Sequence, residues 1–175
     1  MKKVSTDKGS TTISILVCAM AIIFVIMPVF SSVIEKYLIF NKAQIIKDAL
    51  DITNIAAYNA INAESLSMNS VMFDRDKLEG IYARLLAENL NLDSNFFPNE
   101  GSVADERVII DSVIVYTDGF PVTCPEGNLI KRPTVHSSVI VPVKPLLYGS
   151  VIMDMLKKEY VELIVHVDSE IPVDN

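Results

Sequence analysis

The side chains with the most potential for chemistry are one cysteine and two histidines in the second half of the chain. Cys124, His136 and His166 are residue types that bind zinc or transfer protons. Their spacing, however, follows none of the ligand patterns that mark zinc sites in sequences. We therefore expect surface or half-buried strand histidines and an inert exported thiol at Cys124, with no metal and no cofactor.

The carboxylates show no pairing that would indicate catalysis. The acidic residues of the second half are scattered, among them Asp105, Glu106, Asp111, Glu159 and Glu162. This distribution is typical of a solvated face rather than of general acid-base work. The sequence also lacks a glycine-rich phosphate loop and the HExxH, CxxC, GxSxG and EF-hand patterns. We expect a protein without enzymatic activity or a small-molecule substrate.

The first element that organises the chain is an uncharged N-terminal run. Residues 10–34 carry no charge, and residues 13–28 are almost wholly apolar. At about 1.5 Å per residue, such a helix crosses the roughly 30 Å hydrocarbon core of a bilayer. The sequence predicts a transmembrane helix over residues 10–34 after a basic leader at residues 1–9. A cleavable secretory signal, cut near Ser31-Ser32, fits less well because the apolar run is too long.

The charge distribution predicts the orientation in the membrane. The formal net charge is −7; three lysines and one aspartate give residues 1–9 a charge of +2, which leaves −9 for the rest. Basic residues before the span and Glu35 just after it predict a cytoplasmic N-terminus and an extracytoplasmic C-terminal domain in the cell membrane. An acidic exported domain is also a poor partner for nucleic acid.

The helical pattern continues beyond the span as an amphipathic stalk over residues 35–63. Apolar and small residues recur at steps of three and four, and neither Gly nor Pro interrupts residues 31–79. Pro28 is a candidate kink. One stripe of this helix holds Leu38, Ile45, Ala49, Ile52, Ala56, Asn59 and Ala63, and a neighbouring stripe holds Ile46, Leu50, Thr53, Ala57 and Ile61. We expect Leu38, Ile45, Ile52 and Ala56 to pack against the chain's own domain or a partner helix.

The remaining sequence predicts a second helix and a small sheet. Within residues 64–100, Asp76 as N-cap and Glu79 three residues later mark a helix that ends before Pro98. Residues 101–175 are rich in β-branched residues, with strands predicted at 107–117, 134–143 and 160–168, a loop at 121–133 and a helix or turn at 147–158. The expected fold is α+β: the long N-terminal helix, a second helix, and an antiparallel sheet of three to four strands packed on the helices.

The N-terminal region resembles a known family. The order DKGSTTISILV, the apolar run and then VIEKYLIFNKAQIIKDALDITNIAAYNAI, roughly residues 7–63, look like the start of TadE/TadG-like pilus-assembly proteins. These are pseudopilin-like components of tight-adherence (Flp) pili. The resemblance implies a leader cut between Gly9 and Ser10. In that family a glutamate stands five residues after the glycine, where this chain has Ser14.

Two functions follow from these expectations. The first is a non-enzymatic accessory component of a tight-adherence pilus or related secretion assembly in a bacterium, whose partners are the bilayer and other assembly subunits. Ser14 favours an accessory role, because a glutamate buried in a filament core demands a cationic partner and serine does not. The alternative is a membrane-anchored ligand-binding or sensor module, which requires a pocket with convergent polar groups.

Overall fold

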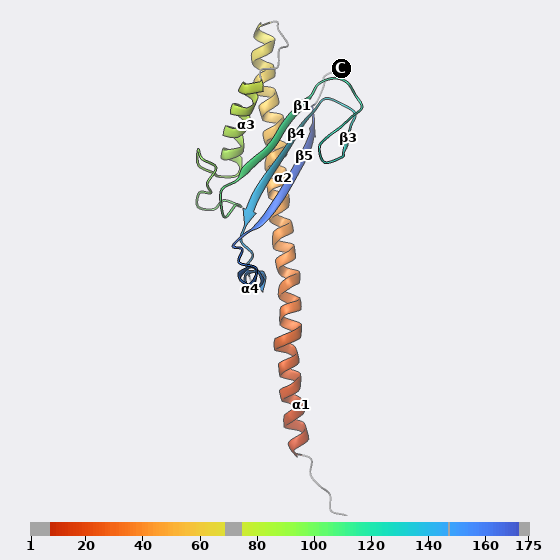
Figure 1. Ribbon diagram of the computed structural model, residues 1–175, viewed down its shortest axis with the longest axis vertical. Coiled ribbons are helices and arrows are strands. Elements are labelled where there is room, and N and C mark those ends of the chain that lie inside the picture. Colours follow the sequence, from red (N-terminus) through yellow and green to blue (C-terminus); the bar gives the residue numbers. More distant parts are fainter. Residues whose placement is uncertain (1–7, 69–74, 147, 172–175) are drawn as a thin grey trace, which may run out of the picture.

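A single long helical rod runs through the molecule in the computed structural model, which describes residues 8–68, 75–146 and 148–171 (Figure 1). The rod consists of α1 (Lys8–Ala21), a π-helical turn η1 (Ile22–Ile26) and α2 (Met27–Met68). It contains one helix that is long and apolar enough to cross a membrane. Of the predicted basic leader, residues 1–7 lie outside the described residues.

The π-helical turn stands directly before Pro28, where the sequence predicts a kink. Proline has no amide hydrogen, so it cannot bond to the carbonyl one turn earlier, and its ring crowds that carbonyl. A π-turn is one way for a helix to absorb such a local mismatch without ending. The hydroxyl of Ser32 donates to the carbonyl oxygen of Pro28 at 2.8 Å. The irregularity is therefore local, and the helix continues to Met68.

The second half of the chain forms an antiparallel sheet of three strands. Its order is β1 (Ile109–Tyr116), β4 (Thr134–Val143) and β5 (Val161–Glu170), so the most buried strand lies in the centre. The three predicted strands are confirmed to within two residues at each end. The predicted loop at 121–133 contains a small hairpin of β2 (Val122–Thr123) and β3 (Leu129–Ile130), which sequence reasoning missed.

The hydrophobic core lies between one face of the sheet and two helices. Valines and leucines at alternate positions of the strands face α2 and α3 (Arg75–Asn89), as the two-residue period predicts (Figure 1). The fully buried side chains include Ile46, Leu50, Leu78, Tyr82, Leu86, Val108, Val139, Val141 and Val143. The α+β fold class is confirmed, with helices on one face of an antiparallel sheet.

One boundary differs from the sequence predictions. The helix α3 begins at Arg75, so Asp76 lies inside the first turn and is not its N-cap. The predicted stalk at residues 35–63 lies within α2, and Ile46, Leu50 and Ala57 of this segment belong to the hydrophobic core.

Polar side chains also join α2 to the sheet and to α3. Asn54 is fully buried and donates from Nδ2 to Oγ of Ser169 at 2.9 Å, and the Ser169 hydroxyl donates to Asp51 at 2.5 Å. On the α3 side, Asn89 donates to the hydroxyl of Thr53 at 2.8 Å. Buried polar groups are tolerated when they find such partners. These bonds fix the rotation of α2 about its axis.

Asp105 ties α2 to the end of the central strand. Its carboxylate accepts hydrogen bonds from Nζ of Lys42 at 2.8 Å and from the amide of Lys144 at 2.7 Å. Burial raises the pKa of Asp105, but the hydrogen bonds and charges of both lysines outweigh burial and hold the pKa below its ordinary value. A depressed pKa means that this contact stabilises the fold above the unfolded pKa and is lost as the pH falls through the folded pKa.

Candidate functional site

The end of the domain that faces α1 is closed by a short amphipathic helix. This helix, α4 (Tyr148–Met155), packs against α2 at Glu35, and the Glu35 Oε2 atom accepts a hydrogen bond from the amide of Gly149 at 2.7 Å. The glutamate is buried, with only 7% of its surface exposed. Carboxylates are stabilised beside the first turn of a helix by its free amides and dipole. Glu35 thus fixes α4 to the first charged position after the uncharged run.

Gly149 is required for this close contact. A Cβ atom at this position would lie 2.5–2.6 Å from the Glu35 carboxylate, so a residue with a side chain would displace the carboxylate. The glycine therefore lets the α4 backbone approach the carboxylate directly. Sequence reasoning used Glu35 only as an orientation marker and did not identify this contact.

The predicted packing stripe of α2 is only partly involved in the domain. Ile45 and Ile52 are 52% and 59% exposed, so of the two predicted contacts, with the chain's own domain or with a partner helix, they do not make the first within this chain. Leu38 is 36% exposed, and Ala56 is half-buried. The neighbouring stripe, which includes Leu50, faces the sheet instead. Contact of the exposed stripe with a partner helix stays a prediction.

The predicted cleavage position lies at the start of the rod. Gly9 and Ser10 are the second and third residues of α1. From Thr11 onward the side chains of the apolar run are exposed on every side of the helix, and none of the membrane-spanning window is buried within the molecule. An apolar helix without a protein cover is the arrangement expected for lipid contact.

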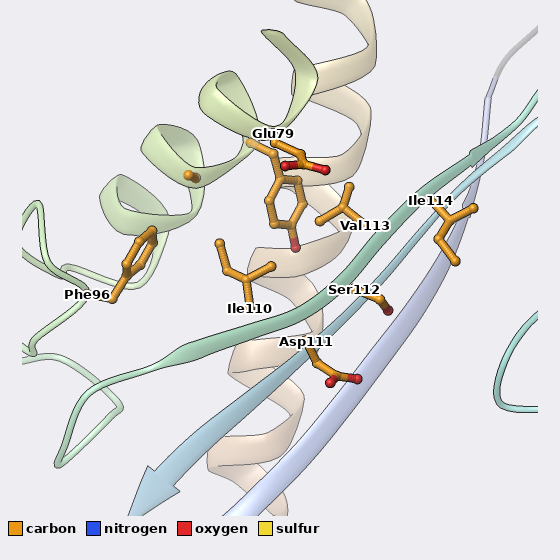
Figure 2. Close-up of a pocket in the computed structure, with 9 residues that line it drawn as sticks. Glu79, Phe96, Ile110, Asp111, Ser112, Val113 and Ile114 are labelled. Carbon is orange, nitrogen blue, oxygen red and sulfur yellow. The ribbon is translucent and has the colours of Figure 1, made fainter. Parts of the chain in front are cut away.

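An open cleft of about 550 Å³ lies between α3 and strand β1. Figure 2 shows Ile110 and Val113 facing α3, whereas Asp111 and Ser112 lie on the other side of the strand. Ligand pockets normally aim several polar groups at one point. Glu79 lines the α3 side of the cleft, whereas Asp111 and Ser112 lie beyond the strand, so these three polar side chains are not aimed at one point.

A cluster of titratable side chains lies on the opposite face of the sheet, beneath the β2–β3 hairpin. His136 is fully buried on β4, and its Nδ1 atom lies 2.6 Å from Oδ1 of Asp168, its cross-strand neighbour on β5. Its Nε2 atom lies 3.0 Å from Oε2 of Glu126 in the hairpin. The thiol sulfur of Cys124 and these Glu126 and His136 atoms all lie within 4.8 Å of one another.

The hairpin turn orders this cluster. The amide of Asn128 donates to the Cys124 sulfur at 3.3 Å, and Nδ2 of Asn128 donates to Oδ2 of Asp168 at 2.8 Å. Burial raises the pKa of the Tyr116 phenol nearby, and the negative groups of the cluster raise it further. Sequence reasoning named Cys124 and His136 but expected neither to meet Glu126.

His166 is the third residue considered for zinc from the sequence. Its ring centroid lies 6.5 Å from that of His136, and it is half-buried. The structure therefore brings together two of the three residues named from the sequence, and adds Glu126 and Asp168.

Comparison with known proteins gives no match to a family model, to a curated protein or to a solved structure. The resemblance to TadE/TadG-like proteins stays a prediction based on the N-terminal residues. The function must be argued from the helix, its exposed surface and the side-chain clusters described above.

Proposed function

We propose that the chain is a non-enzymatic, membrane-anchored, pseudopilin-like accessory component of a tight-adherence pilus or a related secretion assembly. The main observation in support of this proposal is that the two halves of one helix have different surroundings. Its second half is a core element of the folded domain, whereas its first half is apolar and exposed on all sides. A domain built on a projecting apolar helix is suited to join lipid or the helices of other subunits.

The exposed stripe of α2 supports a partner contact. Leu38, Ile45 and Ile52 lie seven residues apart, which places them along one line of the helix. Exposure of isoleucine side chains to water costs free energy, so a row of them on a helix favours packing against another helix. The occupant that we propose is the N-terminal helix of another subunit of the assembly.

Cysteine crosslinking tests this contact. In a Cys18→Ser background, Ile45→Cys and Ile52→Cys are labelled with a benzophenone maleimide, which on illumination inserts into neighbouring C–H bonds, and are expected to form adducts with another subunit in membranes of the native host. The control is Lys47→Cys, which is also exposed but lies about 200° around the helix from Ile45. Mass spectrometry identifies the partner, which must itself carry an N-terminal apolar helix. Equal adduct yields at all three positions would contradict the proposed stripe.

The intact mass of the same native material tests leader processing. A mature chain that begins at Ser10 supports prepilin-type cleavage after Gly9. A chain that keeps Met1 limits the proposal to a permanently anchored accessory subunit. A start near Ser32 means a secretory signal and contradicts the anchored helix.

The surface of α4 supports a second contact, with the outer face of the bilayer. Val151, Ile152, Met155 and Leu156 are exposed on this helix and just after it, and α4 is the part of the domain nearest to α1 (Figure 1). Because Glu35 joins α4 to the end of the uncharged run, these side chains lie at the level where the span leaves the hydrocarbon. Lys157 and Lys158 follow and can reach lipid head groups.

A single tryptophan reports this lipid contact. The chain contains no tryptophan, so Met155→Trp introduces the only one. In the full chain reconstituted into vesicles, its emission is expected to shift to shorter wavelength and to be quenched by lipids brominated on the acyl chain. The control is Leu129→Trp on β3, which is 57% exposed and lies at the other end of the sheet (Figure 1). Emission from position 155 that matches the control would exclude insertion of α4.

A further inference from the structure

The cluster beneath the β2–β3 hairpin has an unusual arrangement of charge. Glu126 and Asp168 approach the two ring nitrogens of one buried imidazole, at 3.0 Å and 2.6 Å. In the part of the chain that the structure describes, neither carboxylate forms an ion pair with a lysine or an arginine. The side chains of Glu126 and Asp168 are 24% and 21% exposed, and two carboxylates held around one imidazole attract a cation.

The hydrogen bonds of the cluster determine which of its atoms are still available to bind an ion. Both oxygens of Asp168 are occupied, one by His136 Nδ1 and the other by the side chain of Asn128. When Nδ1 carries the hydrogen and donates it to Asp168, Nε2 keeps a free lone pair. Nε2 is buried and has no hydrogen-bond partner, even though Glu126 Oε2 is 3.0 Å away. Nε2 and the Glu126 carboxylate are thus both close together and available as ligands.

We propose that Cys124, Glu126 and His136 bind a divalent metal ion of the zinc type, with Asp168 as the residue that positions His136. Thiolate, imidazole and carboxylate are the three zinc ligands of proteins, at about 2.0–2.3 Å from the metal. A carboxylate on the far nitrogen of the ligating histidine is the usual outer partner of such a site. The amide hydrogen bond from Asn128 holds the Cys124 sulfur at the cluster.

The geometry requires a small rearrangement. Ligand atoms around a tetrahedral zinc are separated by roughly 3.3–3.7 Å, as its bond lengths dictate. Here Glu126 Oε2 and His136 Nε2 are 3.0 Å apart and the three ligand atoms lie within 4.8 Å of one another, so ion binding must move the carboxylate slightly away from the imidazole and bring the Cys124 sulfur closer. Glu126 is partly exposed at the edge of the cluster, which provides a path for the ion. Three protein ligands leave a fourth position for water or for a group from a partner.

Binding is tested on the full chain in detergent, stripped of metal and kept reduced. Titration with Co²⁺ is expected to give one equivalent per chain, with the near-ultraviolet band of a cobalt thiolate and the visible bands of tetrahedral cobalt. Added Zn²⁺ is expected to bleach both. Cys124→Ser is expected to abolish the thiolate band, and Cys18→Ser, the control for the other thiol, to keep it. Absence of the bands in the unaltered chain would overturn the proposal.

The carboxylates are tested separately, because replacement of the fully buried His136 puts the fold at risk. Glu126→Gln is expected to weaken Zn²⁺ binding by about tenfold or more, and Asp168→Asn by about 10–100-fold while the thiolate band remains. The control is Glu170→Gln on the exposed end of β5, which is expected to leave affinity unchanged. Affinities of Glu126→Gln and Cys124→Ser equal to that of the unaltered chain would also overturn the site. This result is independent of any role in pilus assembly.

Discussion

Leu50→Ala is expected to lower the free energy of unfolding of the folded domain by about 2–5 kcal/mol. Leu50 is fully buried on α2, at the centre of the contact between this helix and the sheet. Removal of its side-chain carbons loses the transfer free energy and leaves a cavity, because the sheet cannot collapse onto the helix. A loss of this size is a large part of the stability of an ordinary domain.

Pulse proteolysis in urea measures this loss on the detergent-solubilised chain. The matched control is Ile52→Ala, two residues away on the same helix and 59% exposed. It is expected to change the free energy of unfolding by no more than about 0.5 kcal/mol. The opposite result, a large loss at Ile52 and little at Leu50, would mean that the other stripe of α2 faces the domain.

The contrast between Leu50 and Ile52 also shows what the sequence could and could not predict. Both stripes of α2 are apolar, so hydropathy alone does not decide which one faces the sheet. The deciding residues are Thr53, which lies on the stripe that includes Leu50, and Asn54, whose polar side chain is typical of a solvent-facing position. They are buried because Ser169 and Asn89, distant in the sequence, supply their hydrogen bonds. Pairing of this kind cannot be found by a periodic pattern.

The strands were predicted well because their signal is local. Runs of β-branched residues and the alternation from Val161 onward predict both the position of β5 and its buried face. The cluster at His136 was not predictable in the same way. His136 meets Asp168 only because of the register between β4 and β5, and it meets Glu126 only because a hairpin covers that face of the sheet. Register and loop placement depend on the whole fold.

The N-terminal half of the rod differs from α2 in having no protein cover. Ile23 lies near the middle of the uncharged run and is 52% exposed, and the spanning window has a mean hydropathy of 2.9 with none of it buried. In water this surface would have to be covered by another molecule, whereas in a bilayer lipid covers it. The two environments make opposite predictions for a charge placed at Ile23.

Ile23→Arg is expected to lower the equilibrium constant for membrane integration by roughly 100-fold, because an arginine at the centre of a spanning helix costs about 2.5–3.5 kcal/mol. The measurement is carbonate extraction of membranes that contain the newly made chain, with protease protection of the C-terminal domain. The control is Thr11→Arg, whose longer side chain can reach the lipid head groups from the start of the span. If Ile23→Arg resists extraction as well as the unaltered chain does, lipid does not surround this helix, and a protein partner covers it instead.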